Sequence, residues 1–264
     1  MHLLAEMENP RLTGEAALMT EKVAFITGGN RGLGFQTALE LKDAAKVAIG
    51  SRDLAQGKKA VEKLRAAGVD ADVLKFDVTQ PEDHQAAYDY FHTRYGRLDI
   101  LVNNAGIAGG TFPGTGPEHR AADVPMALLR KVFETNFFAQ VALTEKLLPL
   151  IRKSPAGRIV NLSSILGSLT LHADPKSGIY DSKSFAYDAS KTALNAFTVH
   201  LAYELRGTKI KVNSAHPGWV KTDMGGPQAR MELSEGAKTS AMLATLPDDG
   251  PTGGYFHLGE TLPW

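Results

Sequence analysis

A tyrosine and a lysine lie four positions apart, as Tyr187 and Lys191, in a segment with helical periodicity. Side chains at positions i and i+4 share one face of a helix, so both can point at one site. A free tyrosine has a pKa of about 10, and a neighbouring ammonium favours the phenolate. Such a tyrosine can give a proton to a carbonyl oxygen or take one from an alcohol. Taken alone, the pair is more often helix packing with a solvated charge, so its role depends on its neighbours.

Other residues that suit the same chemistry follow predicted strands or lie in a long helix. Ser163-Ser164 ends a predicted strand, and the Ser164 hydroxyl can polarise a carbonyl oxygen through a hydrogen bond. Asn136 lies inside the long predicted helix. Two further motifs follow strands, namely Asn103-Asn104-Ala105-Gly106 and Pro217-Gly218-Trp219-Val220-Lys221-Thr222. The carboxyl ends of parallel strands meet at one edge of a sheet, which is where open α/β sheets bind ligands.

A glycine-rich turn joins the first predicted strand to a helix, with the sequence Thr27-Gly28-Gly29-Asn30-Arg31-Gly32-Leu33-Gly34. Gly28 permits a tight turn, Gly32 lets the backbone approach a pyrophosphate, and Gly34 allows the helix to pack closely on the sheet. The helix N-terminus offers free N–H groups and the positive end of a dipole to phosphates. Because a strand precedes the turn and a βαβ pattern follows it, the turn predicts a dinucleotide site.

Two arginines indicate which dinucleotide binds. An NAD site usually places a carboxylate at the end of the second strand, on the ribose. Here that strand ends Gly50-Ser51-Arg52, and Arg31 lies in the glycine-rich turn. Two guanidinium groups suit a 2′-phosphate. The pair therefore predicts NADP (NADPH), the alternative being that both arginines are solvated surface residues.

The elements that must position these residues follow an alternating pattern. The apolar runs expected as strands are residues 22–27, 47–50, 71–76, 98–102, 158–162 and 210–215, and the amphipathic runs expected as helices are 33–41, 54–67, 82–95, 125–151 and 187–205. Strands that alternate with helices imply βαβ units with right-handed crossovers. We therefore expect the α/β class, with a single-domain Rossmann fold: a doubly wound, mostly parallel sheet with helices on both faces. Residues 1–20 are interpreted as a flexible N-terminal tail and 21–264 as the domain.

Composition excludes several classes of function. Lys+Arg and Asp+Glu both number 29, so the net charge is zero and predicts neither a nucleic-acid nor an anionic-membrane partner. The absence of cysteine excludes disulfides and thiolate chemistry and makes a cytoplasmic location the natural expectation. No apolar run is long enough to predict a membrane span. The eight histidines show no metal-ligand spacing, so we expect no catalytic metal.

In this order and combination, the motifs resemble those of the short-chain dehydrogenase/reductase superfamily. The resemblance covers residues 22 to about 222 and implies the catalytic residues Asn136, Ser164, Tyr187 and Lys191. Of the serine pair, the family pattern marks the second as catalytic. Asn136 would hold a water that links Lys191 to bulk solvent, and Lys191 would also bind the nicotinamide ribose.

The resemblance also assigns the remaining contacts to the cofactor. Thr222 and the backbone at Val220 would hold the carboxamide, Asp77-Val78 would contact the adenine, and Asn104 would line the groove. Together, the turn, the arginines and the resemblance predict cofactor binding by Gly28, Asn30, Arg31, Gly32, Leu33, Gly34, Ser51, Arg52, Asp77, Val78, Asn104, Ala105, Gly106, Tyr187, Lys191, Pro217, Gly218, Val220 and Thr222.

Within the family, residues 29–34 (GNRGLG) and 217–224 (PGWVKTDM) are most similar to the carbonyl reductase branch. That branch generally uses NADPH and reduces aldehydes, ketones or quinones. The resemblance thus implies reversible reduction of an aldehyde or ketone to an alcohol by hydride transfer, with Tyr187 as the acid/base and a small molecule as the substrate. Two alternatives stay open: a reductase dedicated to one substrate class (3-oxoacyl, steroid or sugar), and a non-catalytic NADP-binding sensor.

One segment departs from the family pattern. Tyr187 lies 23 positions after Ser164, which is longer than the usual spacing, and Tyr180 precedes Ser184 where the motif requires lysine. The acid/base role therefore belongs to Tyr187. We expect the extra residues, 168–185, at the rim of the substrate pocket near Tyr180 and Trp219.

The two long predicted helices, 125–151 and 187–205, carry apolar residues on more than one face. A helix that is apolar nearly all round needs two covers. The sheet is one cover, and a symmetry mate is the natural second. We therefore expect a homodimer or homotetramer rather than a monomer, the alternative being that residues 168–185 fold back over these helices.

Overall fold

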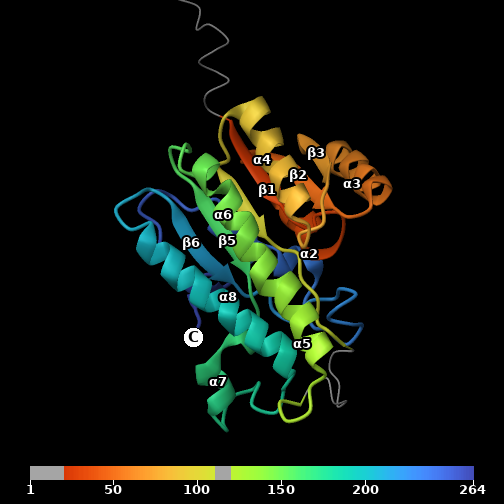
Figure 1. Cartoon of the computed structure of the whole chain (residues 1–264), viewed down its shortest axis with the longest axis vertical. Helices are drawn as coiled ribbons and strands as arrows, with labels where there is room; N and C mark the ends of the chain where they lie inside the picture. The colour runs from red at the N-terminus through yellow and green to blue at the C-terminus, as the bar shows by residue number, and fades with distance from the viewer. Residues whose placement is uncertain (1–20, 111–119) are drawn as a thin grey trace, which may run out of the picture.

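An eight-stranded sheet forms the centre of the computed structural model, which describes residues 21–110 and 120–264 (Figure 1). The strands are β1 Lys22–Ile26, β2 Ala45–Ser51, β3 Ala71–Lys75, β4 Ile100–Asn103, β5 Arg158–Leu162, β6 Lys211–Ala215, β7 Tyr255–His257 and β8 Glu260–Thr261. They are ordered β3-β2-β1-β4-β5-β6-β7-β8, and every neighbouring pair is parallel except β7 with β8. Strand order reverses between β1 and β4, which is the switch point where doubly wound sheets bind ligands.

Helices cover both faces of this sheet. The longer ones are α2 Gly32–Glu40, α3 Leu54–Ala66, α4 Pro81–Tyr95, α5 Met126–Phe133, α6 Ala139–Ile151, α8 Phe185–Glu204 and α10 Lys238–Ala244. Side chains alternate across a strand, so Val23 and Phe25 of β1 join the core under α4, α6 and α8, whereas Ala24 and Ile26 join the core under α2, α3 and α10. The α/β class, the single Rossmann fold and the mostly parallel sheet are confirmed. No helix within residues 21–110 and 120–264 combines the length and the apolar character needed to cross a membrane.

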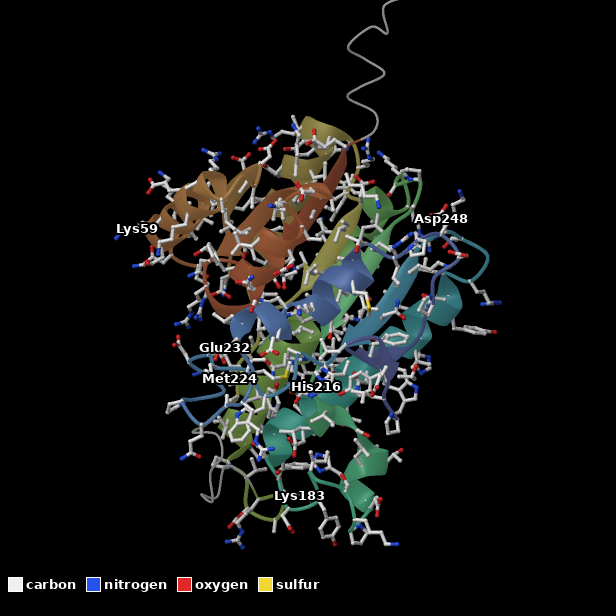
Figure 2. All side chains as sticks on the ribbon, turned by 180° about the vertical axis from the view of Figure 1, so that it is seen from behind. Lys59, Lys183, His216, Met224, Glu232 and Asp248 are labelled. Atoms are coloured by element: carbon white, nitrogen blue, oxygen red, sulfur yellow. The ribbon has the colours of Figure 1, made fainter. Side chains whose placement is uncertain are left out.

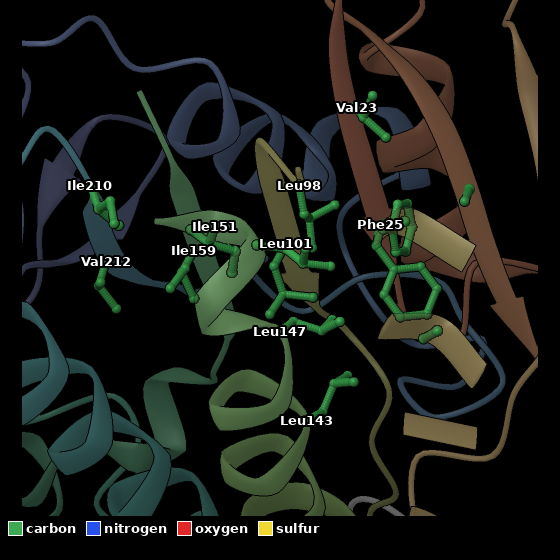
Figure 3. Packing of buried hydrophobic residues seen from close by; sticks show 14 of the residues in the cluster. Val23, Phe25, Leu98, Leu101, Leu143, Leu147, Ile151, Ile159, Ile210 and Val212 are labelled. Atoms are coloured by element: carbon green, nitrogen blue, oxygen red, sulfur yellow. The ribbon is translucent and has the colours of Figure 1, made fainter. Parts of the chain in front are cut away.

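Figure 3 shows the core on the α6 side of the sheet. Leu143, Leu147 and Ile151 recur every four positions along α6 and share a cluster with Leu101 of β4 and Ile159 of β5. All five are at most 1% exposed. Burial of each such side chain contributes roughly 1.5–3 kcal/mol. This packing holds the carboxyl ends of β4 and β5, which carry predicted site residues, in a fixed relation to α6.

The structure differs from the sequence expectation in its C-terminal part and in the long helix. Strands β7 and β8 and the helices α9 (Leu233–Gly236) and α10 were not predicted. The helix expected over 125–151 begins at Met126 and is interrupted by η2, a π-helical turn at Glu134–Phe138. Residues 1–20, interpreted as a tail, lie outside the described residues.

The segment between β5 and α8 contains more regular structure than its polar composition indicated. A 3-10 turn, η3, spans Ile165–Gly167, and a short helix, α7, spans Leu169–Ala173. The Ser168 hydroxyl accepts a hydrogen bond from the Leu171 amide and so caps α7. The Thr170 amide donates to the Trp264 carbonyl oxygen at 2.8 Å, which ties α7 to the C-terminal segment.

Candidate active site

A cavity of about 760 Å³ opens at the carboxyl ends of the parallel strands. Six post-strand segments contribute to its lining, from the glycine-rich turn after β1 to the Pro217–Thr222 segment after β6. The predicted residues that line it are Gly28, Asn30, Arg31, Gly32, Leu33, Arg52, Asp77, Val78, Asn104, Ala105, Gly106, Ser164, Tyr187, Lys191, Pro217, Gly218, Val220 and Thr222. The fold therefore gathers residues that span most of the sequence into one site.

The glycine-rich turn has the backbone shape that a pyrophosphate needs. Gly28 and Gly32 adopt φ angles of +64° and +57°, which residues with a Cβ rarely adopt. A Cβ on Gly34 would lie 2.5 Å from Asn104 Nδ2 and 2.7 Å from the Gly28 carbonyl oxygen. Gly34 thus serves close packing and does not line the cavity. No described side chain caps the start of α2 or places an acid in its first turn, so its N–H groups suit an anion.

The two arginines that are predicted to bind a 2′-phosphate lie at this cavity. Arg31 and Arg52 both line it. Arg31 forms an exposed ion pair with Asp223, which lies in the segment after β6. The nearby Asp53 carboxylate accepts hydrogen bonds from the backbone amides at positions 55 and 56, so it caps α3. Ser51 is buried, and its hydroxyl donates to the Asp53 carbonyl oxygen at 2.7 Å, outside the cavity lining.

Ser164, Tyr187 and Lys191 meet at the same cavity. The Ser164 hydroxyl and the Tyr187 phenol share a hydrogen bond. The Lys191 ammonium donates to the Leu162 carbonyl oxygen at 2.7 Å and lies 5.6 Å from the centroid of the Tyr187 ring. Two groups that can hydrogen-bond one substrate oxygen are thus placed beside a cation.

Asn136 lies behind the lining, fully buried within the π-helical turn. Its Oδ1 accepts from the Ile107 amide at 2.8 Å, and its Nδ2 donates to the Ile107 carbonyl oxygen at 2.9 Å and to Ser190 Oγ at 3.0 Å. Ser190 Oγ in turn donates to the Tyr187 carbonyl oxygen at 2.6 Å. Asn136 therefore joins the strand exit after β4 to the helix that carries Tyr187 and Lys191. Single π-helical turns are frequent at functional sites.

Burial controls the protonation of the tyrosine and the lysine. It raises the pKa of Tyr187 to about 12, with a smaller raising effect of Asp188 and a lowering effect of the Ser164 hydrogen bond. It lowers the pKa of Lys191 to about 8. The raised pKa of Tyr187 is opposite in direction to the effect that a neighbouring ammonium has on a phenol. Burial disfavours the charged form of each group and is the largest cause of both shifts.

Several lining residues were not predicted from the sequence. They include Lys131 of α5, Glu134 and Thr135 of η2, Leu166 of η3, and Met224. Glu134 and Thr135 directly precede Asn136, and Met224 ends the PGWVKTDM motif, so proximity to the motifs was an available signal. Leu166 carried no such signal, because η3 was not predicted.

The expectation that residues 168–185 lie at the rim of the substrate pocket stays a prediction. None of them is among the residues that line the cavity, whereas Trp219 is. The Tyr180 ring instead lies under the Lys183 ammonium, 4.9 Å from it. α7 contacts η3, and the hydrogen bond from the Thr170 amide to the Trp264 carbonyl oxygen ties it to the C-terminal segment. Among the described residues, no group of three or more His, Asp or Glu side chains is placed to hold a metal ion.

Comparisons with known proteins give a consistent set of relatives. A family model described as short chain dehydrogenase matches residues 22–233. Carbonyl reductase (NADPH) 1 of Mus musculus is 34% identical over 281 residues, covering 92% of this chain and 98% of the mouse protein. The solved structure of NADPH-bound carbonyl reductase from chicken fatty liver matches with a TM-score of 0.78 and 26% identity, covering 92% of this chain and 99% of that one. Salutaridine reductase from Papaver somniferum matches with a TM-score of 0.76 and 29% identity, covering 89% of this chain and 99% of that one.

Proposed function

The chain belongs to the short-chain dehydrogenase family and is an NADP-dependent oxidoreductase, and we propose that it reduces an aldehyde or ketone to the alcohol, reversibly, with NADPH. The observation that carries the proposal is the placement of Ser164, Tyr187 and Lys191 at one cavity, with the serine and tyrosine hydroxyls hydrogen-bonded to each other. The names of the relatives, carbonyl reductases that use NADPH, support the same reaction.

The glycine-rich turn and the arginines support the cofactor assignment. The turn leaves backbone N–H groups and open space at Gly32, where a Cβ would meet only Thr222 Cγ2 at 4.0 Å. Arg31 and Arg52 would hold the 2′-phosphate, and Asp53 is engaged as a helix cap. When bound, NADPH supplies the hydride that reduces the carbonyl carbon.

The chain's own residues handle the oxygen of the substrate. Ser164 donates a hydrogen bond to the carbonyl oxygen and polarises it, and Tyr187 gives its phenolic proton to that oxygen. Because burial raises the pKa of Tyr187 to about 12, the phenol carries its proton at neutral pH and is ready to act as an acid. In the reverse direction the phenolate takes the proton of the alcohol. Lys191 binds the nicotinamide ribose. Asn136 fixes the position of α8 relative to the segment that follows β4.

The remaining lining suits an apolar carbonyl compound. Ile107, Leu166, Trp219 and Met224 contribute apolar surface, and Ser164 and Tyr187 contribute the polar groups that orient the substrate. Small-molecule sites commonly combine an apolar wall with a few placed polar groups. Because these apolar side chains accompany the two hydroxyl groups that can bind a carbonyl oxygen, we propose aldehydes and ketones as the substrate class.

A panel assay tests the proposed function. The purified chain is incubated with NADPH or NADH and a series of aliphatic and aromatic aldehydes, ketones and quinones, and loss of the reduced nicotinamide absorbance is followed. We expect turnover of several apolar members, with a higher kcat/KM for NADPH than for NADH. Turnover of one compound alone would support a dedicated reductase instead. NADPH binding without turnover of any member would support a sensor and overturn the proposal.

A further inference from the structure

A buried histidine, His216, lies between the segment that carries Ser164 and the segment that is predicted to hold the carboxamide of the cofactor. It directly follows β6, and Figure 2 shows it near the centre of the molecule. It is 8% exposed and is not among the residues that line the cavity, whereas Pro217 and Gly218, which follow it, are. Buried polar groups are normally hydrogen-bonded, so the contacts of this ring show which groups it holds together.

The His216 ring accepts hydrogen bonds from two backbone amides at one nitrogen. The Ile165 amide donates to His216 Nδ1 at 3.1 Å, and the Gly218 amide donates to the same atom at 3.3 Å. A backbone amide can only donate, so Nδ1 carries no hydrogen and the neutral ring carries its hydrogen on Nε2. Ile165 directly follows Ser164 in the sequence. One ring atom therefore joins the residue after Ser164 to the predicted cofactor-binding segment.

The backbone ladder between β5 and β6 ends where these hydrogen bonds begin. The last paired positions are Leu162 and Ala215, and the Ser163 amide still donates to the Ala215 carbonyl oxygen at 2.8 Å. Pro217 has no N–H with which to continue the ladder, and both segments then line the cavity. The His216 side chain thus supplies a link between the two segments beyond the last backbone pair.

Contacts with β7 hold the His216 ring in place. Its amide donates to the Phe256 carbonyl oxygen at 2.8 Å, and its own carbonyl oxygen lies 2.9 Å from His257 Nδ1. The two imidazole rings lie 4.8 Å apart, inclined at 40°. Burial, and secondarily His257, lowers the pKa of His216 to about 3. The ring therefore stays neutral in the pH range of assays and offers a constant acceptor to the two amides.

We propose that His216 is a positioning residue, whose Nδ1 fixes the distance between Ser164 and the Pro217–Thr222 segment and so aligns the substrate carbonyl with the nicotinamide. The inference rests on the proposed function, because it requires Ser164 to bind the substrate oxygen and the segment after β6 to bind the nicotinamide end of NADPH. His216 lies outside the cavity lining, so it acts through the backbone of Ile165 and Gly218. Such alignment matters for the rate, because a misplacement of about 1 Å can cost 10²-fold.

Three substitutions at position 216 test the role of Nδ1. Asparagine places its Oδ1 as many bonds from Cα as Nδ1 is, glutamine places its oxygen one bond further, and leucine removes the acceptor. We expect His216→Leu and His216→Gln to lower kcat for carbonyl reduction by about ten- to a hundredfold, whereas His216→Asn should keep most of the wild-type rate. A His216→Asn variant that is no faster than His216→Gln, or a His216→Leu variant with wild-type kcat, would overturn the proposal.

Cofactor binding gives a readout that does not depend on turnover. In His216→Leu the Gly218 amide loses its partner, so Kd for NADPH, followed by nicotinamide fluorescence, should rise about five- to tenfold, the effect of one lost hydrogen bond. Kd for NADH should rise by the same factor, because the two cofactors differ only in the 2′-phosphate. Unchanged constants, or a change for NADPH alone, would contradict a role at the nicotinamide end.

His92→Leu is the matched control. His92 is an exposed residue of α4 and does not line the cavity, and the same substitution there removes an identical ring. Its kcat and its two Kd values should equal those of the wild type. Losses as large as those of His216→Leu would show that the effect does not depend on the position of the histidine, and the proposal would fail.

A measurement on the wild-type protein covers the case in which the variants at position 216 do not fold. Nitrogen-15 NMR of labelled histidine distinguishes a ring nitrogen that carries a hydrogen from one that accepts a hydrogen bond. At neutral pH the His216 signals should show an unprotonated Nδ1 and a protonated Nε2. The opposite tautomer, or a ring protonated at both nitrogens, would overturn the proposal. If the wild type shows no carbonyl turnover, the proposed function fails, while the NMR and Kd measurements still decide whether His216 joins the two segments.

Discussion

At the scale of single residues, two tyrosines illustrate how position outweighs residue type. Tyr187 is half-buried at the cavity beside Ser164 and Lys191, whereas Tyr180 is more exposed and lies under Lys183. Both belong to the same stretch of sequence, and only one can reach a substrate oxygen in the cavity. This difference makes them a matched pair for mutagenesis.

Tyr187→Phe should abolish turnover while leaving cofactor binding nearly intact. The change removes the proton donor and leaves the phosphate-binding turn untouched, and loss of a general acid typically costs about 10²–10⁴ in rate. Steady-state kcat measures the first effect, and NADPH fluorescence titration measures the second. Tyr180→Phe is the control and should keep wild-type activity. Retained turnover in Tyr187→Phe would remove this residue from the mechanism.

Replacing Arg31 and Arg52 together by alanine should raise KM for NADPH far more than KM for NADH. Both guanidinium groups line the cavity, and charge-assisted contacts to the 2′-phosphate exist for NADPH alone. We expect at least a tenfold change in the ratio of the two constants, or about 1.4 kcal/mol of discrimination. Arg65→Ala is the control, because Arg65 pairs with Asp72 outside the cavity. Equal shifts of both constants would show that the arginines do not read the phosphate.

At the scale of elements, two local backbone features position the site residues. The glycine-rich turn brings the start of α2 against the strand exit after β4, and the π-helical turn η2 directs Asn136 inward to the Ile107 backbone. Both features depend on close backbone approach. A substitution that adds bulk or removes an amide there should therefore disturb the site although it touches no substrate.

Gly34→Ala should weaken NADPH binding and destabilise the fold. The new Cβ would meet Asn104 Nδ2 at 2.5 Å and the Gly28 carbonyl oxygen at 2.7 Å, and a backbone atom cannot give way cheaply. Overpacking of this kind typically costs about 1–3 kcal/mol. Urea unfolding measures the stability and fluorescence titration the affinity. Gly178→Ala is the control, since a Cβ there would meet nothing within 4 Å. Equal behaviour of the two variants would contradict the tight packing at Gly34.

At the scale of the whole molecule, exposed apolar side chains on the long helices indicate whether the chain forms oligomers. Phe138 of η2 is 54% exposed, and Val199 and Tyr203 of α8 are 40% and 63% exposed. Figure 1 shows α7 beyond the lower end of α8 and not across its length, so the segment between β5 and α8 does not cover this face. An apolar helix face without a cover within the described residues favours a symmetry mate.

We therefore propose a homodimer or homotetramer in solution. Light scattering at micromolar concentration should give a mass of at least twice the chain mass of 28.4 kDa. Val199→Glu together with Tyr203→Glu should reduce that mass without loss of folding, because both side chains are already exposed to solvent in the single chain. A wild-type mass near 28.4 kDa would show a monomer and contradict this proposal.

Much of the architecture follows from local pattern. The six longer parallel strands, the glycine-rich turn and the helix that carries Tyr187 and Lys191 were all predicted within a few residues. Strands of a buried parallel sheet are continuous apolar runs, and a helix imposes a spacing of four on residues that share a face. The α/β class and the sequence order of the site residues could therefore be derived from the sequence alone.

The short C-terminal strands, the contacts between distant residues and the pKa shifts depend on the three-dimensional fold. Strands β7 and β8 span three and two residues, too short for a periodic signal, and exist because β6 offers an edge. Asn136 hydrogen-bonds to the Ile107 backbone, and Asp188 lies 3.4 Å from His172; no spacing rule predicts either proximity. Burial raises the pKa of Tyr187, whereas a neighbouring lysine by itself indicated a lowered pKa. The burial of a side chain depends on contacts with residues from the whole chain, so a local sequence pattern does not determine it.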